Sequence, residues 1–178
     1  MFKIKEKILI HQIKNGDEQA FTIFYNSYKD KIYRFVYFRV SQPEKAQDLV
    51  GDTFIKIYDY IRQGHEIDNF QALLYKIARN LVIDFYRTKR EEIPLEDAPE
   101  MISSDDLENE VNNRVKIDQV KKYLSQVKKE YQEVVQLHFF ENFSFSEIAE
   151  IINQSEGNVR VRAYRGIKQL KKALKELE

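Results

Sequence analysis

The sequence contains no cysteine among its 178 residues, and only five glycines and three prolines. Without cysteine there is neither a disulfide framework nor a thiolate metal site, which fits a reducing compartment. The scarcity of glycine and proline favours long helices over a fold rich in strands and turns. No segment is apolar for long enough to be a signal-peptide core or a membrane span. We therefore expect a cytoplasmic, helical protein that makes no membrane contact itself.

Patterns of catalytic and metal-binding residues are also missing. His11, His65 and His138 lie far apart, and none has a partner at metal-ligand spacing. There is no glycine-rich phosphate-binding motif. Asp48 and Asp52 are one helical turn apart without a base or nucleophile nearby, which favours an exposed contact for a basic partner over a catalytic pair. We expect a protein that is not an enzyme and binds neither metal nor cofactor.

Charge is distributed unevenly, although the formal net charge is zero. Residues 1–90 hold 16 Lys and Arg against 11 Asp and Glu, and residues 153–178 hold seven against three. Residues 91–117 hold two Lys and Arg against nine Asp and Glu. Two basic ends around an acidic middle suggest nucleic acid at both ends, although solvated charged surfaces give a similar pattern.

Apolar residues recur every three or four positions through the first ninety residues. The pattern predicts helices over about 18–40, from Pro43 to Gly64, and from Phe70 onward, with Asp17 as the N-cap of the first. Three amphipathic helices with short connections, preceded by a short N-terminal one, are typical of a helical bundle.

The segment EEIPLEDAPEMISSDD, at 91–106, has no such periodicity. Its two prolines and many acids are typical of a flexible linker. Helical patterning resumes near Leu107. We therefore predict an all-α protein with two helical domains, at 1–90 and 107–178, joined by an acidic linker.

Residues 144–172, SFSEIAEIINQSEGNVRVRAYRGIKQLKK, predict a helix-turn-helix. Ser144 and Glu147 have the spacing of a capping box, which places a helix start at Ser144. Asn153 tolerates the left-handed conformation of a sharp turn, and Ser155 can cap the following helix. The second helix has an apolar stripe opposite a basic face, so we expect the acidic first helix to pack and the basic second helix to face a polyanion.

The chain resembles bacterial RNA polymerase sigma factors of the extracytoplasmic-function (ECF) group. The resemblance rests on four segments in the family's order: NGDEQAFTIFYNSYKDKIYRF, PEKAQDLVGDTFIKIYDYI, FQALLYKIARNLVIDFYR and EVVQLHFFENFSFSEIAEIINQSEGNVRVRAYRGIKQLKKAL. They are similar, in turn, to the opening of sigma domain two, the helix that grips core polymerase, the helix that engages the minus-10 element, and domain four, which binds the minus-35 element. The resemblance implies a non-catalytic subunit that binds core RNA polymerase, directs it to promoters and helps melt the minus-10 region.

The resemblance also implies three groups of contact residues. Within 44–62, the expected contacts with core polymerase are the acids Asp48, Asp52 and Asp59. Beside the loop 64–69, the expected contacts with minus-10 DNA are Lys76, Arg79, Asn80, Arg87, Lys89 and Arg90. Asn80 would read a base edge, the cations would hold phosphates, and the nearby rings of Tyr75, Phe85 and Tyr86 could stack on bases. The expected contacts with the minus-35 element are Ser155, Asn158, Arg160, Val161, Tyr164, Arg165 and Lys168, with Arg160 reading a guanine.

A second interpretation is a free-standing helix-turn-helix regulator whose N-terminal bundle serves dimerisation or sensing. The basic last helix of that bundle favours the sigma factor, because a sensing bundle does not need one. The expected partners are core RNA polymerase and promoter DNA. The resemblance also implies an anti-sigma protein as a candidate partner.

Overall fold

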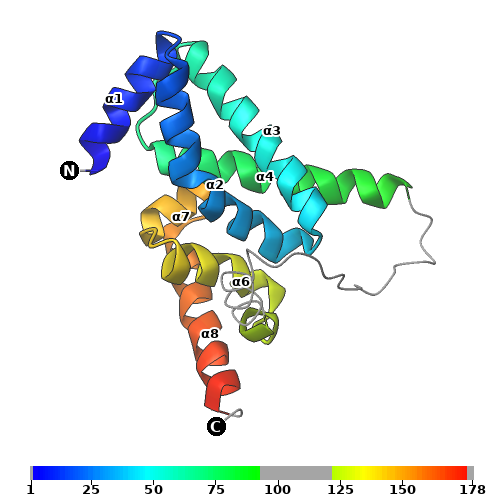
Figure 1. Cartoon of the computed structure of the whole chain (residues 1–178). Coiled ribbons are helices and arrows are strands. Elements are labelled where there is room, and N and C mark those ends of the chain that lie inside the picture. The colour runs from blue at the N-terminus through cyan, green and yellow to red at the C-terminus, as the bar shows by residue number, and fades with distance from the viewer. Residues whose placement is uncertain (1, 93–121, 176–178) are drawn as a thin grey trace. The chain divides into compact units, whose positions relative to one another are not determined.

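The computed structural model describes residues 2–92 and 122–175, and all the regular elements within these ranges are helices, which confirms the predicted all-α fold (Figure 1). Contacts divide the chain into two compact units, residues 1–102 (unit 1) and 103–178 (unit 2). The predicted limits of the two domains remain a prediction. Of the predicted linker, residues 91 and 92 belong to the last helix of unit 1, and residues 93–106 lie outside the described residues. No helix in the described ranges is long and apolar enough to cross a membrane.

Unit 1 contains four described helices: α1 (Phe2–Lys14), α2 (Glu18–Val40), α3 (Pro43–Arg62) and α4 (Phe70–Glu92). Helices α2 and α3 run in opposite directions, and α4 packs against both of them (Figure 1). Helix α1 packs against α2 and α3, so the end of α1, the start of α2 and the end of α3 meet at one end of the unit.

The ends of these helices follow local signals in the sequence. The Asp17 carboxylate accepts hydrogen bonds from the backbone N–H groups of Gln19 and Ala20, at 2.9 and 3.0 Å, which confirms it as the N-cap of α2. Pro43 is the first residue of α3, where its missing N–H loses no hydrogen bond. Gly64 follows α3 with φ of +81°, a conformation that favours glycine.

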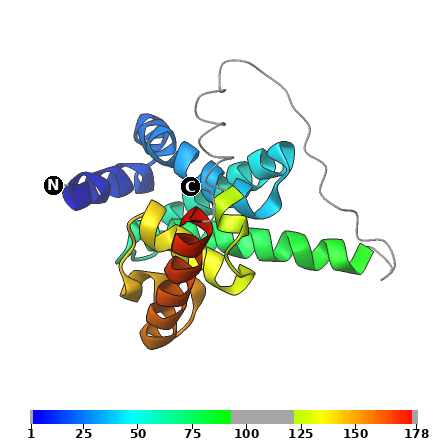
Figure 2. The same ribbon diagram turned by 90° about the horizontal axis from the view of Figure 1, so that it is seen from below.

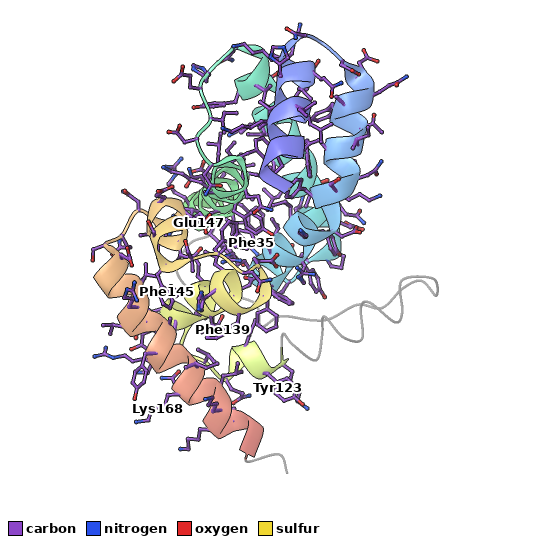
Figure 3. The ribbon with its side chains drawn as sticks, turned by 90° about the vertical axis from the view of Figure 1, so that its left-hand side faces the viewer. Phe35, Tyr123, Phe139, Phe145, Glu147 and Lys168 are labelled. Atoms are coloured by element: carbon purple, nitrogen blue, oxygen red, sulfur yellow. The ribbon has the colours of Figure 1, made fainter. Side chains whose placement is uncertain are left out.

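Interlocking aromatic rings fill the core of unit 1. The ring centroid of Phe24 lies 5.6 Å from that of Phe54 and 4.8 Å from that of Phe70, both in edge-to-face arrangements. Phe35 of α2, labelled in Figure 3, lies 4.9 Å from Tyr75 of α4. Because Tyr75 is only 2% exposed, the prediction that it could stack on DNA bases is wrong. The periodicity of the sequence did not show that Tyr75 lies on the buried side of α4.

Polar contacts fasten α1 to the rest of unit 1. Arg62 Nη1 donates to the Lys14 carbonyl at 3.0 Å, and Lys14 Nζ donates to the Gly64 carbonyl at 3.3 Å. The Tyr28 hydroxyl contacts the Glu6 carboxylate and accepts a hydrogen bond from Gln71 Nε2. Burial, and then the bond to Glu6, raise the pKa of Tyr28 far above its ordinary value. The start of the loop 64–69 is therefore held by both α1 and α3.

The described part of unit 2 contains α6 (Lys129–Val135), the π-helix η1 (Gln136–Phe140), α7 (Phe145–Ile152) and α8 (Glu156–Lys175). Helix α8 packs across α6 and α7 (Figure 2). The π-helical turn is not visible in the periodicity of the sequence. The helical patterning predicted from Leu107 up to residue 121 lies outside the described residues.

The predicted helix-turn-helix is present in unit 2. Ser144 Oγ accepts from the Glu147 backbone N–H at 3.3 Å, and Glu147 Oε2 accepts from the Ser144 backbone N–H at 2.9 Å, so the capping box is confirmed. Asn153 ends α7 with φ of +54°, as predicted. Ser155 Oγ accepts from the Asn158 backbone N–H at 3.3 Å and caps α8.

The contact between α6 and α8 depends on a glycine that the sequence analysis did not identify. Val159 and Ala163 are buried, as expected from the apolar stripe of α8, and Ile167 is half-buried. A Cβ at Gly166 would lie 2.4 Å from Val135 Cγ2 and 3.1 Å from Tyr131 Cβ. Such distances are too short for an unchanged structure, so only glycine lets the two helices approach this closely.

Candidate polymerase and nucleic-acid interfaces

The three acids expected to contact core polymerase are all exposed on α3. Asp48, Asp52 and Asp59 fall on one face by the helical repeat, together with Ile55, whose side chain is 61% exposed. Lys45 Nζ lies 3.2 Å from Asp48 Oδ2, but both side chains are mostly exposed and such pairs are weak. We call these four residues the α3 face. The sequence analysis missed Ile55, whose exposure among the acids adds an apolar side chain to this face.

The loop 64–69 is fixed at both ends. At its start, Gly64 accepts the hydrogen bond from Lys14 described above. At its end, Asn69 Oδ1 accepts from the Ala72 backbone N–H at 3.1 Å and caps α4. Between them, the exposed His65 lies 4.5 Å from the ring of Tyr60, and its Nε2 is 3.1 Å from Gln63 Oε1. His65 of the loop and Tyr60 of α3 therefore form a small aromatic surface, and hydrogen bonds hold both ends of the loop.

The structure gathers only some of the residues expected to contact minus-10 DNA. Lys76, Asn80 and Arg87 are exposed and share one face of α4 with Ile83, which is 46% exposed. We call these four residues the α4 face. Arg87 Nη2 lies 3.2 Å from Asp84 Oδ1, again as an exposed pair. Arg79 is half-buried beside this face.

The α4 face does not include Lys89, Arg90 or Tyr86. Lys89 falls on the other side of α4 by the helical repeat, so the structure does not bring it to the α4 face. The prediction for Arg90 lies outside the described side chains. Tyr86 is 41% exposed, and its hydroxyl donates to the Arg39 carbonyl at 2.6 Å. Burial raises the pKa of Tyr86. Tyr86 thus ties α4 to the end of α2.

The residues expected to contact the minus-35 element extend from Ser155, just before α8, to Lys168 in its second half, and all of them are exposed. One face of α8, which we call the α8 face, consists of Asn158, Val161, Tyr164, Arg165 and Lys168. Tyr164 is 69% exposed and Val161 48%, so both side chains are accessible to a partner. Lys168 is labelled in Figure 3. Arg160 lies at the margin of this face, toward α7.

An open pocket of about 330 Å³ lies beside the α8 face, between the starts of α6 and α8. Its lining comprises Glu130, Tyr131, Gly157, Asn158, Val161, Arg162 and Arg165. The half-buried Arg162 was not among the predicted contacts, and its position next to Arg165 adds positive charge to this edge of the α8 face. Within the described ranges, no group of three or more acids and histidines could hold a metal ion.

Comparison with known proteins identifies the family. The Sigma-70 region 2 family model matches residues 24–92, and the Sigma-70 region 4 model matches residues 117–170. The ECF RNA polymerase sigma factor SigW of Bacillus subtilis is 30% identical over 94% of this chain and 96% of SigW. The ECF RNA polymerase sigma factor BldN of Streptomyces coelicolor is 29% identical over 93% of this chain, which spans 64% of BldN. The chain belongs to the ECF RNA polymerase sigma factors.

Solved structures agree with this fold. CnrH, in complex with the cytosolic domain of CnrY, is 20% identical with a TM-score of 0.72, covering 97% of this chain and 98% of CnrH. The sigma factor RpoE, in complex with the anti-sigma factor NepR from Bartonella quintana, is 22% identical with a TM-score of 0.67, covering 88% and 98%. The family membership confirms the resemblance seen in the sequence and favours the sigma factor over a free-standing regulator.

Proposed function

We propose that this chain is a non-catalytic specificity subunit of bacterial RNA polymerase that acts in the cytoplasm, directs the core enzyme to particular promoters and helps melt the minus-10 region. The observation that carries the proposal is that the exposed α3, α4 and α8 faces follow one another along the chain in the order that the family implies. Each face has the chemistry of a different partner.

The α3 face is proposed to bind core polymerase. Its three acids can pair with basic residues of a partner, while Ile55 can be buried at the centre of the contact. Charges of this kind steer association and fix the register of an interface. Among the residues that the structure describes, Asp48 has an exposed ion pair with Lys45 that a partner can replace at little cost, so binding requires little rearrangement of α3.

The loop 64–69 and the α4 face are proposed to hold single-stranded minus-10 DNA. The neighbouring His65 and Tyr60 rings offer a surface for a base, since stacking on aromatic rings tolerates any base. Asn80 carries both a donor and an acceptor and can read a base edge. Lys76 and Arg87 supply positive charge for phosphates, which makes binding depend on salt.

The α8 face is proposed to enter the major groove of the minus-35 element. The backbone N–H groups at the start of α8 that Ser155 does not cap can approach a phosphate, and Gly157 leaves open space there, since a Cβ at that position would meet no atom within 4 Å. Arg165 and Lys168 are proposed to hold phosphates, whereas Arg160 reads a guanine. Since the related RpoE was solved with an anti-sigma factor, an anti-sigma protein is a further proposed partner.

Reconstitution tests the proposal directly. Purified chain is mixed with bacterial core polymerase, binding is measured by pull-down, and transcript starts are mapped on genomic DNA. Start sites that share upstream motifs, and appear only when chain and core are both present, are the expected result. Sequence-specific binding of the chain to duplex DNA without core polymerase would instead indicate a free-standing regulator.

Charge reversal on the α3 face sharpens this test. The variant Asp48→Lys/Asp52→Lys should lose binding to core polymerase while keeping its helical circular dichroism, because it turns attraction into repulsion. A variant with Asp30→Lys and Glu150→Lys, two exposed acids of α2 and α7, carries the same change in net charge and should bind normally. Equal binding by both variants would contradict the assignment of the α3 face.

A further inference from the structure

The guanidinium of Arg160 is held from two directions. Glu156 Oε1 accepts hydrogen bonds from Arg160 Nε at 3.0 Å and from Nη2 at 2.5 Å. Arg160 Cζ also lies 4.9 Å from the ring centroid of Phe145, which fits a cation–π contact. One contact comes from the preceding turn of α8 and the other from the first residue of α7, so both helices of the helix-turn-helix fix this side chain.

These two contacts leave one edge of the guanidinium open. An arginine side chain has five N–H donors in a rigid plane, and Glu156 occupies the edge formed by Nε and Nη2. The end formed by Nη1 and Nη2 still has two N–H groups that point away from Glu156. Two parallel N–H groups match the O6 and N7 acceptors of guanine. Because the Arg160 side chain is 61% exposed, this end can reach a ligand.

Phe145 is itself held in place. It follows the capping box at Ser144 and begins α7 (Figure 3). Its ring stacks on His138 of η1, with centroids 4.3 Å apart and planes 28° apart. His138 Nδ1 donates to the Phe143 carbonyl at 2.8 Å, which fixes the imidazole in turn. The π-helical turn thus supports the ring on which Arg160 lies.

We propose that Phe145 and Glu156 are positioning residues that preset Arg160 to bind the edge of one guanine in the minus-35 element. The inference rests on the proposed function, because it requires α8 to lie in a major groove. Ordering a long side chain opposes binding, and a side chain that is already ordered avoids this loss. Glu156 has a second effect: its carboxylate competes with DNA phosphates for the Arg160 guanidinium and so keeps Arg160 from binding the DNA backbone, which favours specificity over affinity.

The two positioning residues therefore differ in a measurable way. Glu156→Ala removes a negative charge and frees Arg160 for phosphates, so binding to every sequence should tighten while base preference weakens. Phe145→Leu changes no charge, so base preference should weaken while the salt dependence of binding stays the same. A residue with only a structural role would not separate preference from salt dependence in this manner.

The experiment uses the full chain with core polymerase and a library of promoters randomised over the minus-35 element. Wild type should prefer a G·C pair at one position, and Arg160→Ala should remove this preference. Phe145→Leu and Glu156→Ala should each reduce the preference for the G·C pair by about two- to tenfold. Phe145→Tyr keeps the ring and should therefore keep the wild-type preference. Phe139→Leu is the matched control. The ring centroid of Phe139 lies 4.7 Å from that of His138, as part of η1, but Phe139 is not the ring on which Arg160 lies.

A double variant tests whether Phe145 acts on base preference through Arg160. If Phe145 acts through Arg160, the double variant Phe145→Leu/Arg160→Ala should have the same base preference as Arg160→Ala alone. Wild-type preference in both Phe145→Leu and Glu156→Ala, or equal losses in Phe145→Leu and Phe139→Leu, would overturn the inference while the proposed function stands. If wild type directs no promoter-specific transcription with core polymerase, the proposed function itself fails.

Discussion

The two units build their interiors from different side chains. Unit 1 packs large rings against one another, and its fully or nearly buried aromatic residues are Phe24, Tyr28, Phe35, Phe54, Phe70 and Tyr75. The described part of unit 2 buries mainly branched aliphatic side chains, with Tyr131 and Phe143 as its buried aromatics. In unit 2, α8 approaches α6 at Gly166, where there is no room for a methyl group. The interior of unit 1 is thus filled by large rings, whereas the described part of unit 2 depends on the close approach of α6 and α8 at Gly166.

This difference affects how each unit holds its surfaces. The α3 and α4 faces lie on helices of 20 and 23 residues that pack against α2, so a small change in one side chain leaves their course largely fixed. Helix α7 has only eight residues, and the position of α8 depends on its contacts with α6 and α7. The α8 face should therefore respond more strongly than the α3 face to small changes in packing.

The largest expected effect is on the ring core of unit 1. Phe24 is 3% exposed and contacts rings of α3 and α4, so Phe24→Ala should destabilise unit 1 by about 3–5 kcal/mol. Hydrogen exchange of amides in α2, α3 and α4 measures this loss within the full chain. Ile23→Ala is the control, because Ile23 is 55% exposed and should change exchange little. A similar effect of both substitutions would show that the rings do not carry the stability of unit 1.

The next effect tests close approach in unit 2. Gly166→Ala places a methyl group where Val135 and Tyr131 already lie, and overpacking of this kind destabilises by about 1–3 kcal/mol. Faster hydrogen exchange in α6 and α8, with unchanged exchange in unit 1, is the expected result. Gly157→Ala, on the same helix but with open space around it, should not accelerate exchange. Equal exchange in the two variants would remove the basis of the comparison between the units.

Local signals made much of the fold predictable. The capping box of Ser144 and Glu147, the left-handed Asn153 and the N-cap Asp17 depend on residues within a few positions of one another, so the sequence alone predicts them. The limits of α2 and α3 follow for the same reason. The predictions for residues 93–121, by contrast, lie outside the described residues.

Contacts between distant residues could not be predicted. The tight approach at Gly166 depends on α6, about thirty positions away, and the burial of Tyr75 depends on Phe35. The sequence shows that a residue is small or aromatic, but its neighbours follow only from how helices cross. The contact between Arg160 and Phe145 was missed for this reason, since it depends on the angle between α7 and α8.

The candidate sites came chiefly from the resemblance to a family, with less support from the physical pattern. Charge and periodicity indicated a basic α8, but they did not separate Lys89, on the far side of α4, from Asn80 on its exposed face. They also did not identify Ile55 and Ile83, because an apolar residue in an amphipathic helix is usually assigned to the core. Exposure had to be seen in the structure.

The smallest expected effect is a stabilisation, opposite in sign to the destabilisation expected for Gly166→Ala. Gly51 lies in the middle of α3, is exposed, and a Cβ there would meet no atom within 4 Å. Gly51→Ala should therefore stabilise unit 1, by up to about 1 kcal/mol, because glycine is a poor helix former. Hydrogen exchange in α3 measures this gain.

Among the described residues of unit 1, none lies where a Cβ at position 51 would be, so we propose that the close approach favouring glycine there is made by the partner. Gly51 lies between Asp48 and Asp52 and beside the α3 face, where a methyl group would keep a closely approaching polymerase surface at a distance. Gly51→Ala should then weaken binding to core polymerase although it stabilises the chain, whereas Gln47→Ala, at a neighbouring exposed position, should leave binding unchanged. A variant that is more stable and binds core polymerase as wild type does would show that the partner makes no close approach at Gly51.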